Sequence, residues 1–171
     1  ISDNKNRDTI GIIIASSGNE RRWSIFKYIE IINFLKTKNF KKFLIISGID
    51  QENDEKLIQK EIGKDIIFTF TAKKKIKDVI PSLINCEFCV GNDTGFSHLS
   101  VNLGIETLII YGDCPPQYYS NLIHHIDIDN PLIRSSTTIE EIEVERVIDK
   151  LTKFLNGRGG RVVEGARLES V

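Results

Sequence analysis

The sequence has no excess of charge of either sign. Its 171 residues carry 23 lysines and arginines against 24 aspartates and glutamates, a formal net charge of −1. No global field therefore attracts nucleic acid or an anionic membrane. The sequence also lacks a signal peptide and any apolar stretch of the ~20 residues that cross a bilayer. We expect a cytoplasmic protein.

Cysteine is scarce, with only Cys86, Cys89 and Cys114. An odd number of cysteines without a signal peptide indicates a reducing compartment. Cys86 and Cys89 have CxxC spacing, but "NCEFCV" is typical of a strand, in which residues three apart point to opposite faces. We therefore interpret both as small buried side chains rather than as a disulfide or metal ligands.

Several familiar motifs are missing as well. The first apolar run is followed neither by a GxGxxG dinucleotide fingerprint nor by a GxxxxGK[ST] phosphate loop. No set of serine, histidine and acid is evident, and no cluster of metal ligands. His124 and His125 are adjacent in an irregular segment, which is a weak metal signal.

Apolar runs and amphipathic segments alternate along residues 9–112. "TIGIIIA" (9–15) is typical of a strand buried on both faces, and 24–40 has apolar residues at helical spacing. Further strands are predicted at 41–48, 65–70, 86–91 and 107–112, and further helices at 51–63, 75–85, 95–103 and 137–156. The last helix begins with a capping-box pattern, and the stretch before it is irregular with at most one short strand. The alternation predicts an α/β fold, a Rossmann-like doubly wound parallel sheet.

The two ends of the chain differ from its body. Residues 1–8 begin without methionine and suggest a linker or a truncated start, so we expect a piece of a larger protein. In 157–171 glycine is frequent and arginine replaces lysine, which suggests a vector-derived or disordered tail. The predicted domain is therefore 9–156.

Two loops at the carboxyl ends of predicted strands carry polar side chains, and this is where such sheets bind ligands. In 91–98, Asp93, Thr94, Gly95 and His98 stand at a helix N-terminus, whose free N–H groups suit a phosphate. Taken alone, this loop is better explained by Asp93 as a helix cap and His98 as a partly buried helix residue.

The loop at 15–23 favours the ligand interpretation. Ser16 and Ser17 follow the first strand directly, and Arg21 and Arg22 come next. Arginine is suited to phosphate oxygens, and cations are unfavourable near a helix N-terminus unless an anion compensates them. We predict that Arg21 or Arg22 reaches the anion addressed by the other loop, and that Trp23 packs between helix and sheet.

The stretch "CEFCVGNDTGFSHLSVNLGIETLIIYG" (86–112) resembles the signature of glycosyltransferase family 9, the ADP-heptose:lipopolysaccharide heptosyltransferases. That signature runs from a strand into Asp-[Ser/Thr]-Gly-x-x-His-Leu-[Ala/Ser], then a small-residue helix and a second strand. "IGIIIASSGNERRWSIFKYIEIINFL" (10–35) is similar to the family's strand, hydroxyl residues, basic residue, Trp and helix. The resemblance covers about 9–155 and implies the C-terminal, nucleotide-sugar-binding half of a GT-B glycosyltransferase.

The resemblance implies an inverting glycosyltransferase that needs no metal and no cofactor. It implies a nucleoside-diphosphate sugar as donor, ADP-heptose in the family, and a lipopolysaccharide core or other glycan as acceptor. The implied location is the cytoplasm, including the cytoplasmic face of the inner membrane. The catalytic base is expected on the N-terminal domain, so the fragment alone would be inactive. The implied donor and phosphate contacts are Ser16, Ser17, Arg21, Asp93, Thr94, Gly95 and His98, and more loosely Glu52 near the ribose or base.

The sequence departs from the family pattern at two places. Gly-x-Pro-Thr is replaced by Gly104-Ile105-Glu106-Thr107, and Phe-Gly-Pro-Thr by Tyr111-Gly112-Asp113-Cys114. The sugar is therefore open, and a more distant member acting on another sugar fits as well. The alternatives are a nucleotide-sugar epimerase half, which would use Asp93 and His98 as acid and base without an acceptor, and a non-enzymatic nucleotide-sugar-binding module.

Overall fold

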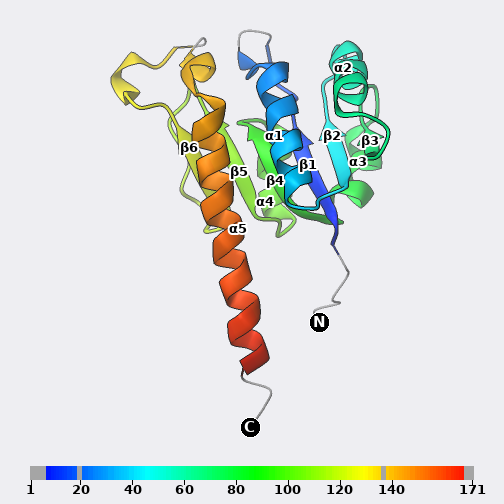
Figure 1. The fold of residues 1–171 in the computed structure, drawn as a ribbon. Helices are drawn as coiled ribbons and strands as arrows, with labels where there is room; N and C mark the ends of the chain where they lie inside the picture. Colours follow the sequence, from blue (N-terminus) through cyan, green and yellow to red (C-terminus); the bar gives the residue numbers. More distant parts are fainter. Residues whose placement is uncertain (1–6, 19–20, 136–137, 168–171) are drawn as a thin grey trace.

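The computed structural model describes residues 7–18, 21–135 and 138–167. Six parallel strands form one sheet in the order β3-β2-β1-β4-β5-β6 (Figure 1). The strands are β1 (Thr9–Ile13), β2 (Lys42–Ile46), β3 (Ile67–Phe70), β4 (Cys86–Asn92), β5 (Thr107–Tyr111) and β6 (Ile123–Asp127). The helices are α1 (Ile25–Thr37), α2 (Glu52–Ile62), α3 (Ile76–Leu83), α4 (Gly95–Asn102) and α5 (Val144–Arg167), with 3-10 turns η2 (Pro131–Ile133) and η3 (Thr138–Glu141). The predicted Rossmann-like fold is confirmed.

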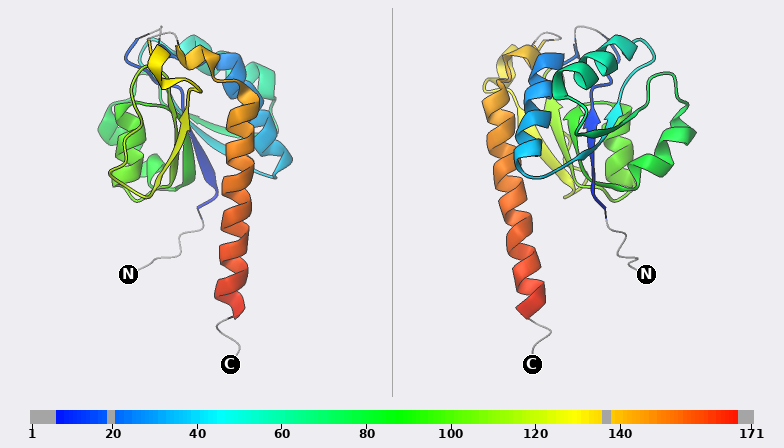
Figure 2. Two further views of the ribbon diagram at one scale, coloured as in Figure 1. Left: turned by 90° about the vertical axis from the view of Figure 1, so that its left-hand side faces the viewer. Right: turned by 45° about the vertical axis from the view of Figure 1, so that its right-hand side comes forward.

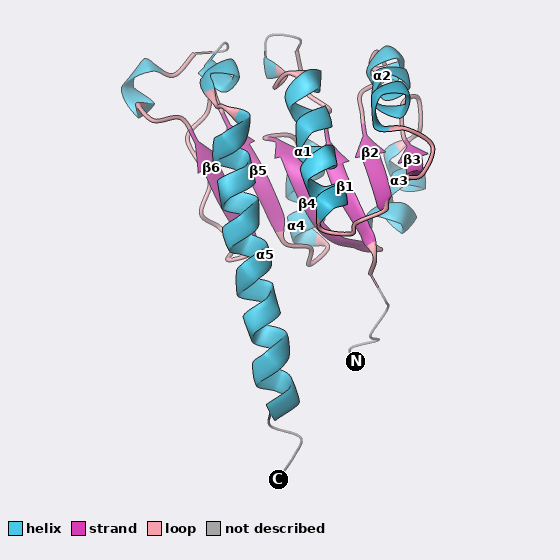
Figure 3. Ribbon diagram, in the orientation of Figure 1, coloured by secondary structure: helices cyan, strands magenta, loops and turns pink. Residues whose placement is uncertain are grey.

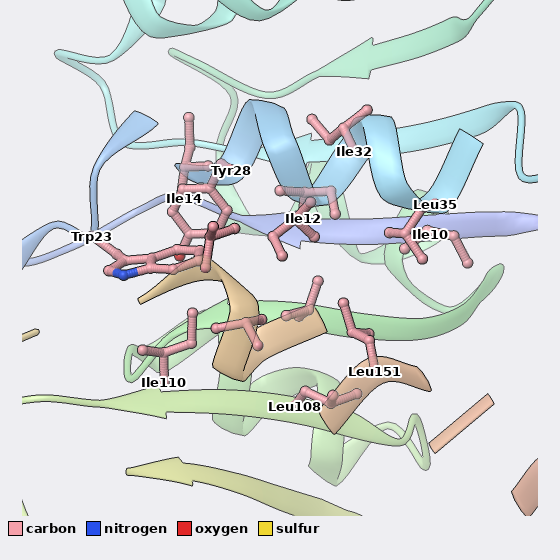
Figure 4. Packing of buried hydrophobic residues seen from close by; sticks show 14 of the residues in the cluster. Ile10, Ile12, Ile14, Trp23, Tyr28, Ile32, Leu35, Leu108, Ile110 and Leu151 are labelled. Atoms are coloured by element: carbon pink, nitrogen blue, oxygen red, sulfur yellow. The ribbon is translucent and has the colours of Figure 1, made fainter. Parts of the chain in front are cut away.

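Helices cover both faces of the sheet (Figures 2 and 3). The larger core lies under α1, α2 and α5, where isoleucines of the strands pack against Trp23, Tyr28 and Leu151 (Figure 4). A smaller core lies under α3 and α4 on the opposite face. Burial on two faces explains why the strands are β-branched runs rather than alternating apolar and polar residues.

The strand order places the two polar loops side by side. β1 and β4 are neighbours, with Ile13 level with Gly91, so both strands end at the same height. From these ends the chain leads to α1 on one face and to α4 on the other (Figure 1). This is the topological switch point, where open α/β sheets leave a crevice for ligands.

The prediction that the side chains of Cys86 and Cys89 point to opposite faces of the sheet was wrong. β4 contains a bulge against β1: Thr9 pairs with Cys86 and Ile10 with Phe88, so Glu87 is an extra residue. A bulge shifts the alternation by one, and Cys86 and Cys89 therefore point into the same core layer. Both are free, buried thiols, and the hydrogen bond with Cys86 together with burial raises the pKa of Cys89.

The last part of the chain also differs from the prediction. The irregular stretch before the last helix was predicted to contain at most one short strand, and this strand is β6. The helix predicted at 137–156 begins later, at Val144, after the η3 turn. Ile139 and Ile142 are buried, and the carbonyl of Ile142 accepts hydrogen bonds from Trp23 Nε1 and Lys27 Nζ. These contacts fix a tight turn against α1 where the capping-box pattern predicted a helix start.

The helix α5 also continues beyond residue 156, to Arg167. Arg158, just past the predicted boundary, pairs with Glu106 at 2.9 Å and lies over the ring of Phe154. The helix thus runs across the boundary set by composition, which stays a prediction, and 1–6 and 168–171 lie outside the described residues. Within the described part, none of the helices combines the length and apolar character needed to cross a bilayer.

Candidate functional site

Asn92, the last residue of β4, connects the two polar loops through hydrogen bonds of its side chain. Its amide nitrogen donates to the carbonyls of Ile14 and Ala15, at 3.2 and 3.3 Å. Its oxygen accepts from the hydroxyl of Tyr28 at 2.8 Å and from the backbone N–H of Trp23 at 3.4 Å. The side chain is buried, so these bonds hold the start of the β1 loop against the end of β4.

Asp93 and His98 form the next layer of the β4 loop. His98 Nε2 lies 2.7 Å from Asp93 Oδ1, and His98 Nδ1 lies 2.8 Å from the hydroxyl of Tyr119. The carboxylate of Asp93 is therefore engaged with the histidine, and the N-cap residue of α4 is Thr94. The interpretation of Asp93 as a simple helix cap is wrong.

The first turn of α4 is open to a ligand. Gly95 is exposed, and a Cβ atom built on it would meet no other atom within 4 Å. The hydroxyl of Thr94 makes no capping hydrogen bond in the described part of the chain. The first backbone N–H groups of a helix have no acceptor within it, so this turn presents donors and a partial positive charge.

The β1 loop approaches the same place through Arg21. Its Nε atom lies 3.0 Å from Asp113 Oδ2, in the loop after β5, and the arginine side chain is about half exposed. Ser16 is half-buried and donates to the carbonyl of Gly18, while Ser17 is exposed. Arg21 thus crosses the end of β4 to reach the β5 loop.

The side chain of Arg22 extends away from the loops after β4 and β5. Its guanidinium pairs with Asp50 at 2.7 Å, in the loop after β2. With Gln51 and Asp54 it lines a pocket of about 270 Å³ beside the start of α1. Arg21 or Arg22 was predicted to reach the anion, and Arg21 is the one that extends to the loop after β5, while Arg22 extends to the loop after β2. Glu52 is paired with Lys56 and Lys73, which lowers its pKa.

Unpaired polar atoms gather at this edge. Among the side chains that the structure describes, three buried polar atoms lack a hydrogen-bond partner: Arg22 Nε, Thr94 Oγ1 and Tyr111 Oη. They lie on the loops after β1 and β4 and at the end of β5, which are adjacent strands. Buried unpaired groups are rare in folded proteins, so Thr94 Oγ1 and Tyr111 Oη mark the ends of β4 and β5 as a candidate ligand site, whereas Arg22 Nε belongs to the separate pocket beside α1.

Burial and the charge of Asp93 act in the same direction on the ionisable groups here. Burial, followed by the charge of Asp93, raises the pKa of Tyr111 and of Tyr119. Burial, followed by Asp113 and Asp93, raises the pKa of the Cys114 thiol, and Arg21 opposes this. Both phenols and the thiol therefore stay neutral at neutral pH. The charged groups beside them are Asp93, Asp113 and Arg21.

The structure thus brings most of the predicted residues together. Asp93, Thr94, Gly95 and His98 lie together at the end of β4, Arg21 reaches the loop after the neighbouring strand β5, and Ser16 and Ser17 lie at the start of the β1 loop. Sequence reasoning missed Tyr119 and the pairing role of Asp113. Tyr119 lies in a stretch without periodicity, so no pattern could have marked it, whereas Asp113 was visible as a departure from the family.

The sequence model of glycosyltransferase family 9 (heptosyltransferase) matches residues 2–142. A search of curated proteins found no significant match. Among solved structures, the glycosyl transferase family 9 protein from Veillonella parvula matches with a TM-score of 0.75 at 16% identity, covering 90% of this chain and 47% of its own.

Two Escherichia coli structures are also similar. Heptosyltransferase WaaC with ADP matches with a TM-score of 0.72 at 16% identity, and ADP-heptose lps heptosyltransferase II with 0.71 at 19%. These matches cover 88% and 90% of this chain but 45% and 48% of the other chains. The chain therefore shares their fold and spans about half the length of the structures it matches.

Proposed function

Because the chain belongs to glycosyltransferase family 9, we propose that it is the donor-binding half of an inverting, metal-independent glycosyltransferase. The proposed donor is a nucleoside-diphosphate sugar, ADP-heptose in the first instance, and the acceptor is a lipopolysaccharide core or related glycan. The structural neighbours include a heptosyltransferase with ADP and one in complex with ADP-D-beta-D-heptose, which supports this class of donor. The proposed location is the cytoplasm, at the inner face of the membrane.

The gathering of hydrogen-bond donors at one edge of the sheet is the observation that carries the proposal. The open first turn of α4, the hydroxyl of Thr94 and the guanidinium of Arg21 surround the ends of β1 and β4. A diphosphate provides acceptors for all of them, and helix N-termini bind phosphate readily. Ser16 and Ser17 would close the site from the β1 side.

The ion pair between Arg21 and Asp113 determines how easily a diphosphate enters. The arginine is about half exposed, and exposed pairs contribute only ~0–1 kcal/mol. A diphosphate offers more charge than one carboxylate and, like a carboxylate, can accept two parallel hydrogen bonds from guanidinium. Arg21 would therefore exchange Asp113 for the ligand. The carboxylate of Asp113 would stay nearby and weaken binding, because it repels the diphosphate.

The chemistry of this half is stabilisation of the leaving group. As the acceptor hydroxyl displaces the nucleoside diphosphate, negative charge grows on the phosphate oxygens next to α4 and Arg21. Donors placed there beforehand lower the barrier, and loss of one such donor costs about 10²- to 10³-fold in known enzymes. The base that activates the acceptor would come from the other half, so the chain alone should bind the donor without transferring the sugar.

The test is a calorimetric titration of the chain with ADP, UDP, GDP and CMP, with EDTA present. We expect a nucleoside diphosphate to bind, and Arg21→Ala to weaken it about tenfold, because charge-assisted bonds contribute about 1.5–3 kcal/mol. Asp113→Asn should act in the opposite direction and tighten binding about two- to fivefold, because it removes the competing carboxylate.

Arg146→Ala is the matched control, since Arg146 pairs with Asp129 on the surface beside α5 and should leave binding unchanged. Equal affinity of the parent and Arg21→Ala would remove Arg21 from the site. If all four nucleotides fail to bind the parent, the proposed function is wrong.

A further inference from the structure

Two neighbouring tyrosines in the loop between β5 and β6 point to different partners. Tyr119 places its hydroxyl 2.8 Å from His98 Nδ1, with the two ring centres 5.7 Å apart. Tyr118 packs on His125 of β6 instead, with ring centres 4.3 Å apart. Tyr119 is thus connected to the proposed donor site, and Tyr118 provides a natural comparison.

The hydrogen bonds of His98 determine its tautomer. Burial and the charge of Asp93 raise the pKa of Tyr119, so the phenol stays protonated and can donate to Nδ1 of His98. The other ring nitrogen, Nε2, then carries the hydrogen and donates to Asp93. Both nitrogens are engaged, so the ring of His98 is held in one orientation between Asp93 and Tyr119.

The site divides into two parts of different charge. The helix start and Arg21 suit the diphosphate, whereas Asp93 would repel it and can accept hydrogen bonds from sugar hydroxyls. Tyr119 lies on the Asp93 side and is 51% exposed, so its ring is accessible. Aromatic rings have negative faces, on which the C–H groups of a sugar ring can pack.

We propose that Tyr119 is a positioning residue for the transferred sugar, which orients His98 through its hydroxyl and supports the pyranose with its ring. This rests on the proposed function, since it assumes that a nucleoside-diphosphate sugar occupies the site. The affinity for the nucleotide alone should not depend on Tyr119. The reason is that Asp93, His98 and Tyr119 lie to one side of the groups proposed to contact the phosphates. The quantity that reports on Tyr119 is therefore the affinity for ADP-heptose relative to ADP.

The experiment titrates the full chain and its variants with ADP and with ADP-heptose. Tyr119→Leu removes hydroxyl and ring, and should reduce the ratio of the ADP-heptose to the ADP association constant about tenfold while ADP affinity stays within twofold. Tyr119→Phe removes only the hydroxyl and should reduce this ratio about threefold. Tyr118→Leu, the matched control, should leave the ratio unchanged.

A second readout requires no ligand. Nitrogen NMR of His98 in the free chain should show hydrogen on Nε2 in the parent and in Tyr119→Phe, because Asp93 still accepts from Nε2, whereas the Nδ1 signal should shift in Tyr119→Phe as it loses the hydrogen bond from the phenol. The inference is overturned by the same ratio in the parent and Tyr119→Leu, or by an unchanged Nδ1 signal of His98 in Tyr119→Phe. Failure of the parent to bind ADP at all would overturn the proposed function and this inference together, whereas the other two results overturn this inference alone.

Discussion

Replacing Gly95 by alanine is expected to weaken nucleoside-diphosphate binding about tenfold or more while the stability of the fold changes by less than about 1 kcal/mol. A methyl group on Gly95 would meet no protein atom within 4 Å, and the backbone there is not in the left-handed region. Neither packing nor conformation therefore requires glycine at this position. Close approach of a ligand to the helix start does require it, because a methyl group would stand where the phosphate should lie.

Gly91 provides the comparison. A Cβ atom on Gly91 would lie 2.2 Å from the carbonyl oxygen of Ile13, inside the sheet, so Gly91→Ala should lower the unfolding temperature strongly. Thermal unfolding and ADP calorimetry of the two variants separate the two uses of glycine. If Gly95→Ala binds ADP as tightly as the parent, the phosphate does not lie against the start of α4.

Asn92→Ala is expected to lower the free energy of unfolding by about 3 kcal/mol, because it leaves several buried partners unpaired at once. The lost bonds run to the carbonyls of Ile14 and Ala15, the hydroxyl of Tyr28 and the N–H of Trp23. All of these groups belong to the β1 loop or to α1, so the substitution should also detach this loop from β4. We therefore expect weaker ADP binding even at temperatures where the variant is folded.

Denaturant unfolding measures the change in stability. Asn85→Ala is the matched control, since Asn85 makes one exposed hydrogen bond, to the carbonyl of Pro81, and its loss should cost less than about 0.5 kcal/mol. A loss below about 1 kcal/mol for Asn92→Ala would show that the buried amide does not hold the two loops together.

The arrangement of the loops was predictable from the sequence. β-branched runs such as 9–15 identify strands buried on both faces, and repeated alternation with helices permits few topologies. In a parallel sheet the carboxyl ends share one edge, so Arg21 and Asp93 could be expected near each other before any coordinates. Asn92 was visible in the same stretch, but its hydrogen bond from Tyr28 depends on how α1 packs against the sheet.

Other features depend on tertiary contacts that no local pattern records. The bulge at Glu87, an extra residue of β4 opposite β1, reverses the direction of one CxxC cysteine. Tyr119 reaches His98 across 21 residues from a loop without periodicity. The late start of α5 follows from carbonyl contacts of Ile142 with α1, which outweigh the local capping-box preference.

The central claim is that the loops after β1 and β4 bind one diphosphate together, and amide NMR of the chain during an ADP titration tests it most directly. The account predicts that amide signals of the 94–98 turn and of the loop around Arg21 move together, in EDTA, with a single dissociation constant. Signals of α5 around Lys153, on the surface of the domain, should stay in place. Movement of one loop without the other, or movement only at a distant surface, would contradict it.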